Sequence, residues 1–404
     1  MSRIVIIGGG AAGMMAAGFA AQYGHQVTVL EKSKTTCLKL GITGKGRCNV
    51  TNNCDTRTLI ENIPQNGKFL YGAFKRFSPQ DVMDFFESIG VPLKTERGAR
   101  VFPASDKALD VVYALRGFAK ENGVHVVQKR ADKLLLKDGA IAGVIAAGER
   151  FDCDRVLLAT GGLSYPKTGS DGDGYRMAKE VGHHIIAQRP SLVPLNAEDT
   201  CGKMQGLALK NVKLTVLEDG NPIYEDFGEM LFTHFGVSGP LILSASAHMR
   251  KFDRCKYRLL IDLKPALDEK QLDARILRDF SENLNRDFGN SLSGLLPKLM
   301  IPRVIERCGI APWTKVHSVT KEQRKCLCDT IKAFSVEVFS MRGIEEAIIT
   351  SGGVDTKEVD PKTMESKLVN GLFFAGEILD VDAYTGGFNL QIAWSTARTA
   401  AESF

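Results

Sequence analysis

The 404-residue sequence contains no run of about eighteen uninterrupted apolar residues, so we expect no transmembrane helix. Its apolar start, MSRIVIIGGGAAGMMAAGFAA, is interrupted by three consecutive glycines and leads into a strand, a turn and a helix, which does not fit a signal peptide. The sequence also has no large excess of positive or negative charge, because it contains 52 Lys and Arg and 47 Asp and Glu. This balance predicts no nucleic-acid partner and no membrane partner, although it suits an anionic cofactor.

Metal-binding cysteine pairs are absent as well. The nine cysteines are odd in number, form no C-x-x-C pair and follow no zinc or iron–sulfur spacing. The histidines show no ligand spacing either, so we predict no metal site. Reduced thiols in a cytoplasmic protein are the simplest interpretation.

A dinucleotide-binding pattern opens the chain. Arg3 to Ile7 predicts a short buried strand, GGGAAG follows as G-x-G-x-x-G, and a helix should then extend to about Tyr23. HQVTVLEK predicts a second strand that ends at Glu31. The strand, turn, helix, strand and acid together make this pattern specific.

Each glycine of the pattern has a physical purpose. Gly8 permits the tight turn, Gly10 lets the backbone approach a pyrophosphate, and Gly13 lets helix and strand pack closely. The helix N-terminus faces the phosphates. Glu31 can bind both hydroxyls of an adenosine ribose and disfavours a 2′-phosphate, so the unit should hold FAD or NAD.

Two later stretches favour FAD. GLFFAGE predicts an apolar strand ending at Gly376 and Glu377, and TGGFNLQIAWSTARTAA places two glycines before an alanine-rich helix. The positive N-terminus of such a helix can stabilise negative charge on a reduced flavin. A third stretch, ATGG, contains Thr160, Gly161 and Gly162 and is typical of a turn beside a bound dinucleotide.

These stretches resemble the YhiN/BaiN-like FAD-dependent oxidoreductases, also called aminoacetone-oxidase-like, which are distant relatives of the fumarate reductase flavoproteins. The resemblance covers almost the whole chain, in the family's order, through IIGGGAAGMMAA, LGITGKGRCNVTN, ATGGLSYPKTGSDGDGY, GEMLFTHFGVSGP, SGGVDTKEVDPKTMESK and GLFFAGEILDVDAYTGGFNLQIAWSTA. It implies tightly bound FAD, a bacterial or archaeal cytosolic setting, and redox chemistry on a small molecule. Lys45 and Ala397 stand where the family often has glycine, and Lys45 could add a charge beside the flavin.

The motifs and the resemblance together give a set of expected FAD contacts. They are Gly8, Gly10, Ala11, Ala12, Gly13, Glu31, Lys32, Lys39, Thr43, Gly44, Gly46, Arg47, Cys48, Asn49, Ala131, Thr160, Gly161, Gly162, Gly376, Glu377, Gly387, Asn389, Leu390 and Gln391.

We expect an α/β fold in which both chain ends, 1–189 and 339–404, build a doubly wound, Rossmann-like FAD-binding domain. Short alternating segments such as VKLTVLED and YRLLIDL predict an inserted β-barrel-like subdomain at 190–265. Helical periodicity follows and predicts a helical subdomain at 266–338.

Flavin transfers hydride, so the protein must supply or accept a proton. His234 in FTHFGVSGP, Tyr165 in GGLSYPKTG and Arg47 in TGKGRCN are the tentative catalytic candidates. Each has a structural alternative: a packed histidine, a pocket wall and a phosphate contact. Cys48 is more simply a packing residue than a nucleophile, because hydride transfer needs no thiol.

Three functions fit. The first is a reductase that passes hydride from NAD(P)H to an activated C=C bond of a small, possibly steroid-like, molecule. NAD(P)H would bind only transiently, because the sequence has no second G-x-G-x-x-G unit. The second is an amine or aminoketone oxidase that produces hydrogen peroxide, and the third is a flavin-containing protein that binds or modifies RNA. The substrate and the oligomeric state stay open.

Overall fold

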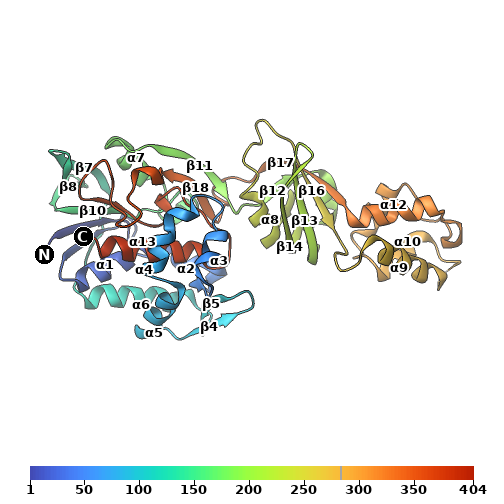
Figure 1. The fold of residues 1–404 in the computed structure, drawn as a ribbon, viewed down its shortest axis with the longest axis horizontal. Coiled ribbons are helices and arrows are strands. Elements are labelled where there is room, and N and C mark those ends of the chain that lie inside the picture. Colours follow the sequence, from blue (N-terminus) through green and yellow to red (C-terminus); the bar gives the residue numbers. More distant parts are fainter. Residues whose placement is uncertain (283) are drawn as a thin grey trace. The chain divides into compact units, whose positions relative to one another are not determined.

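The computed structural model describes residues 1–282 and 284–404, which form two compact units (Figure 1). The first unit combines Met1–Ser191 with Ile344–Phe404, and the inserted unit is Leu192–Gly343. The chain therefore leaves the first unit at Ser191 and returns to it at Ile344.

A five-stranded parallel sheet forms the centre of the first unit, with β1 in the middle. The N-terminal strand thus pairs on one side with β2 and on the other with β10, and the C-terminal β19 pairs with β10. This arrangement confirms the Rossmann-type α/β fold. In spatial order the strands are β19 (Leu372–Phe374), β10 (Arg155–Leu158), β1 (Arg3–Ile7), β2 (Gln26–Leu30) and β6 (His125–Val127).

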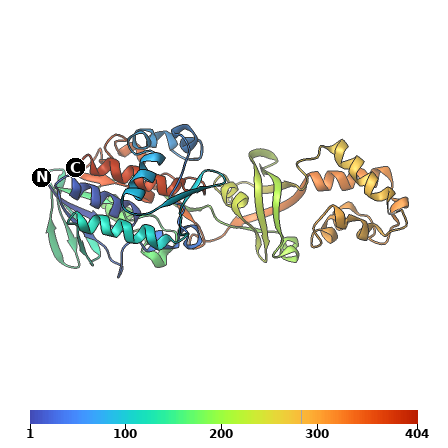
Figure 2. The same ribbon diagram turned by 90° about the horizontal axis from the view of Figure 1, so that it is seen from below.

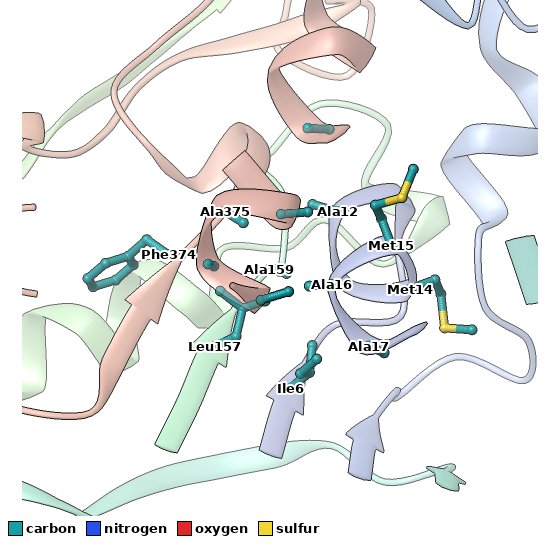
Figure 3. Close-up of a cluster of buried hydrophobic side chains, with 14 of the residues drawn as sticks. Ile6, Ala12, Met14, Met15, Ala16, Ala17, Leu157, Ala159, Phe374 and Ala375 are labelled. Atoms are coloured by element: carbon teal, nitrogen blue, oxygen red, sulfur yellow. The ribbon is translucent and has the colours of Figure 1, made fainter. Parts of the chain in front are cut away.

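Two helices from opposite ends of the sequence, α1 (Ala11–Gln22) and α13 (Phe388–Ala401), pack against each other beside the sheet (Figures 1 and 2). Alanine dominates α1 because this helix is buried among its neighbours. Figure 3 shows Ala16 of α1 next to Leu157 of the sheet. On α13, Ala397 is fully buried, so a methyl group is accommodated at that position.

Smaller elements complete the first unit. The meander β7 (Ala131–Lys137), β8 (Ala140–Ala146) and β9 (Glu149–Asp152) forms an antiparallel sheet, and β11 (Ile185–Ser191) pairs with β18 (Ile349–Val354). The remaining strands and helices are β3 (Thr51–Asn52), β4 (Leu93–Glu96), β5 (Arg100–Pro103), α2 (Leu38–Gly46), α3 (Thr56–Glu61), α4 (Tyr71–Arg76), α5 (Pro79–Ser88), α6 (Ala108–Glu121) and α7 (Asp173–Glu180).

The inserted unit contains a closed six-stranded barrel, which confirms the expected β-barrel-like subdomain. The barrel order is β12 (Leu195–Ala197), β15 (Gly236–Ser238), β14 (Asn221–Thr233), β13 (Ala208–Glu218), β16 (Tyr257–Asp262) and β17 (Phe334–Met341). Helix α8 (Pro240–Ser246) packs on β14. The helices α9 (Glu269–Ser281), α10 (Phe288–Ser291), α11 (Ile301–Cys308) and α12 (Lys321–Lys332) lie between β16 and β17 in sequence.

Two expected boundaries are wrong. The helical segment was expected to extend to residue 338 and the FAD-binding domain to resume at 339. Instead, Phe334–Met341 forms β17, the strand that closes the barrel between β16 and β12, and the first unit resumes at Ile344. The alternating burial of β17 matches a barrel strand. Within residues 1–282 and 284–404, no helix combines the length and the apolar character needed to cross a membrane.

Candidate functional site

A long cavity opens at the carboxyl ends of the parallel strands of the first unit, where open α/β sheets bind their ligands. It encloses about 1220 Å³ of space, including open solvent at its mouth. Fifteen of the expected FAD contacts line it, and they come from both ends of the sequence: Gly8, Gly10, Ala11, Ala12, Glu31, Lys32, Lys39, Thr43, Ala131, Thr160, Gly161, Gly376, Glu377, Asn389 and Leu390.

The glycine turn before α1 leaves room for a pyrophosphate. A Cβ added at Gly10 would meet no atom within 4 Å, whereas a Cβ at Gly13 would lie 1.9 Å from the carbonyl oxygen of Gly8. Helix α1 has no side-chain cap and no acidic residue in its first turn, so its N-terminal amides are available to an anion. Among the described residues, the buried Thr160 hydroxyl in the same cavity has no hydrogen-bond partner. These features fit FAD.

The ribose end of the cavity is organised by Glu31. Its Oε2 accepts a hydrogen bond from the Gly9 amide at 2.8 Å, and its Oε1 accepts one from the Ser33 amide at 2.7 Å. These bonds fix the carboxylate, and each oxygen keeps a second lone pair that can accept from a ribose hydroxyl. Lys32, the next residue, forms ion pairs with Asp171 and with Asp173, so its charge is compensated by protein.

Glu377 and Lys39 form an ion pair inside the cavity. The Lys39 ammonium lies 2.6 Å from Glu377 Oε2, and their side chains are 23% and 12% exposed, respectively. Ser164 accepts from Lys39 at 2.6 Å and donates to Glu377 Oε1 at 2.9 Å. The Thr350 amide also donates to Glu377 Oε1 at 2.9 Å. Both oxygens of this carboxylate are therefore held in fixed positions.

Helix α13 contributes its N-terminus to the cavity wall through Asn389 and Leu390. Its first turn has no side-chain cap and no acidic residue, like that of α1. The Asn389 side chain accepts from the Ala383 amide at 2.9 Å and donates to the Ala383 carbonyl at 2.8 Å, which fixes the loop before the helix. This geometry agrees with a helix whose positive end faces a flavin.

Arg47 is not brought to the cavity. Its guanidinium donates to Glu96 at 2.5 Å and to Asp106 at 2.8 Å, and it lies 4.1 Å from the centroid of the Phe102 ring. Hydrogen bonds from Lys94 and Arg47 hold the pKa of Asp106 below its usual value. The positive charge of Arg47 is thus committed to this surface network instead of to a ligand.

Apart from Thr43, the other residues of the TGKGRCN stretch also lie outside the cavity lining. Cys48 is fully buried, and burial raises the pKa of its thiol to about 12, which agrees with packing. Lys45 is exposed and adopts a left-handed backbone with φ of 58°, a conformation that favours the glycine usual in the family. Gly44, Gly46 and Asn49 do not line the cavity either.

Four further expected contacts do not line the cavity but pack against the elements that form it. Gly13 packs on Gly8, as described above, and a Cβ at Gly162 would lie 2.4 Å from the Thr350 hydroxyl. Gly387 packs equally closely on Thr51. Gln391 is fully buried and donates to the Phe77 carbonyl at 2.9 Å and to Ser395 at 2.8 Å. These residues pack the elements that carry the cavity.

The two remaining catalytic candidates lie in different units. Tyr165 belongs to the first unit, is partly exposed and adopts a left-handed φ of 53°, and the Lys39 ammonium lies 5.8 Å from its ring centroid. Such strain in a non-glycine residue is typical of functional loops. His234 is exposed in the turn between β14 and β15 of the inserted unit.

Sequence reasoning missed several residues that line the cavity. It also missed Ser164 and Thr350, which do not line the cavity but hold Glu377. Ser164 lies within the ATGGLSYPKTGSDGDGY motif, but its spacing does not show which side chain it contacts. In the part of the chain that the structure describes, no cluster of His, Cys, Asp or Glu could hold a metal ion. The missed lining residues include Gly9, Thr35, Leu38, Lys129, Arg130, Asp173, Ile348 and Ile349.

Comparisons with known proteins match the whole chain. The family model described as "HI0933-like protein Rossmann domain" matches residues 2–403. The chain is 33% identical, over all of both proteins, to the 3-dehydro-bile acid delta(4,6)-reductase of Clostridium scindens. It is also 29% identical to the ribosomal RNA dihydrouridine synthase of Escherichia coli, over 98% of this chain and 96% of that protein.

Among solved structures, the 3-ketosteroid-delta4-(5alpha)-dehydrogenase of Rhodococcus jostii matches with a TM-score of 0.55 and 16% identity. The match covers 100% of this chain and 96% of that one. At this identity, the likeness shows a shared fold.

Proposed function

This chain belongs to the HI0933-like Rossmann family and is a flavin oxidoreductase, and we propose that it reduces a C=C bond conjugated to a carbonyl group. A full-length relative carries this proposal, because its name describes the reduction of double bonds in a 3-dehydro-bile acid. In that molecule the double bonds are conjugated to a ketone. We propose the same class of acceptor here, a small and possibly steroid-like molecule.

We propose that the cavity of the first unit holds FAD, which supplies hydride transfer when bound. The amides of α1 and the Thr160 hydroxyl would hold its phosphates, and Glu31 its ribose. The N-terminus of α13 would face the flavin pyrimidine. NAD(P)H would bind transiently as the electron donor.

Reduction of a conjugated bond adds a hydride at one carbon and a proton at the other, so the chain must deliver a proton. Tyr165 and His234 are the proposed proton donors. Tyr165→Phe and His234→Gln test them separately. The donor's variant should lose at least tenfold in kcat for acceptor reduction while FAD remains bound, and the other variant should stay near wild type.

Anaerobic turnover tests the reductase. The purified protein should be bleached at the flavin band by NADH or NADPH without oxygen, and a 3-keto-4-ene steroid should restore the colour. Peroxide formation from an amine, with no nicotinamide required, would instead support the amine oxidase. Failure of both nicotinamides to reduce the flavin would contradict the proposed donor.

A second acceptor is supported by the relative named ribosomal RNA dihydrouridine synthase. Dihydrouridine forms by reduction of the uracil C5=C6 bond, which is conjugated to a carbonyl, so the proposed bond chemistry is the same. The discriminating measurement is dihydrouridine in ribosomal RNA from cells with and without the gene. A loss that the gene restores would assign uracil in RNA as the acceptor, and unchanged dihydrouridine would exclude it.

A further inference from the structure

We infer that Lys39 and Glu377 set the reduction potential of the bound FAD with opposite signs. This inference rests on FAD occupying the cavity and needs no particular acceptor. Both side chains line the cavity, and their charged atoms lie 2.6 Å apart. Their charges therefore nearly cancel as a pair, and the loss of either one would leave the other uncompensated.

The loss of one of these charges should have a larger effect on the reduction potential inside the cavity than it would in water. The side chains of Glu377 and Lys39 are only 12% and 23% exposed, so water screens their charges incompletely. At neutral pH, reduced FAD carries one more negative charge than oxidised FAD, so a nearby cation favours reduction and a nearby anion opposes it.

Neighbouring residues prevent the pair from moving apart when one charge is removed. Glu377 Oε1 accepts from Ser164 and from the Thr350 amide, each at 2.9 Å. The Thr350 hydroxyl in turn accepts from the amides of Leu163 and Ser164, at 2.8 Å and 3.0 Å. Because these bonds remain in a Lys39 variant, Glu377 stays in the cavity as an uncompensated anion. Ser164 and Thr350 are thus positioning residues.

The potential of the bound FAD, measured anaerobically against reference dyes, tests the inference. Lys39→Met should lower the potential and Glu377→Gln should raise it. Each should shift the ratio of reduced to oxidised FAD at least tenfold at a fixed potential, or about 30 mV for two electrons. The double variant should return close to wild type.

Lys45→Met is the matched control. Lys45 carries the same charge, but its side chain is exposed and it does not line the cavity. Its removal should shift the ratio less than twofold. If Lys39→Met does not bind FAD, the upward shift of the reduction potential in Glu377→Gln tests the inference instead. Lys39→Arg keeps the positive charge and should keep the wild-type potential.

Shifts of the same sign in both single variants would overturn the inference, as would shifts below twofold with FAD bound. Neither result depends on any acceptor. A reductase that fails to reduce steroids or uracil can still pass this test, and a variant pair that fails it leaves the proposed reaction untouched.

Discussion

Two glycines of one motif should respond to the same methyl group in different ways. A Cβ at Gly10 would meet no protein atom within 4 Å, but it would enter the space proposed for the pyrophosphate. At Gly13 the Cβ would lie 1.9 Å from the Gly8 carbonyl oxygen, far inside the 3.0 Å that real Cβ atoms keep. Gly10→Ala should therefore affect FAD affinity, and Gly13→Ala should affect stability.

The magnitudes follow from the backbone. Gly10 has φ of −80°, which alanine adopts without strain. Alanine restricts the unfolded chain, which should raise the free energy of unfolding by about 0.4–1 kcal/mol. Alanine is also a poorer N-cap than glycine, which should lower that free energy by a similar amount. Gly13→Ala must separate α1 from the β1 turn in a packed core, at about 1–3 kcal/mol. A domain of about 200 residues loses roughly 2–4 °C of Tm per kcal/mol.

Thermal unfolding of the apoprotein and a titration with FAD separate the two effects. Gly10→Ala should keep the wild-type Tm and weaken FAD binding at least tenfold, or about 1.4 kcal/mol. Gly13→Ala should unfold several degrees earlier before any cofactor is added. The reasoning is refuted if Gly10→Ala unfolds as early as Gly13→Ala while it binds FAD normally.

Three further predictions concern single residues. Burial lowers the pKa of His183, so the folded state resists protonation of this imidazole. The free energy of unfolding should therefore be highest above the unfolded-state pKa of about 6.5 and should fall as the pH drops below that value. His183→Gln should flatten that dependence in denaturant titrations between pH 5 and 7, and an unchanged slope would refute it. Because burial raises the thiol pKa of Cys48 to about 12, iodoacetamide at pH 7.5 should leave it unmodified until the protein unfolds, as peptide mass spectrometry can check. Lys45 is exposed with φ of 58°, so Lys45→Gly should be neutral or stabilising and Lys45→Val should cost about 1–2 kcal/mol by chemical denaturation. Equal stabilities of these two variants would contradict the strain argument.

Local patterns were predicted well because short-range physics determines them. The strand, glycine turn, helix and second strand up to Glu31 depend on neighbouring residues, and the structure contains each of these elements where the sequence places it. The start of the closing strand of the barrel was missed because only Ala333 separates Phe334 from the end of α12. Only its partners in β12 and β16 define this segment as a strand.

Side-chain partners were less predictable, because they come from distant parts of the chain. Arg47 meets Glu96 and Asp106, which lie 49 and 59 residues away, and no spacing rule links them. The pairing of Lys39 with Glu377 spans 338 residues. Both residues were expected near the cofactor, but their mutual contact could not be derived from the sequence.

Residues from the N-terminal part of the chain line one side of the cavity, and residues from the C-terminal part line another. This arrangement has a consequence for biosynthesis. Strand β19 and helix α13 belong to residues 344–404, yet they cover β10 and α1, which are synthesised much earlier. Until the ribosome has made those last residues, the nascent chain exposes an unpaired strand edge and an alanine-rich apolar helix face, both prone to aggregation. A chain that stops before Gly387 therefore lacks the cavity wall formed by α13.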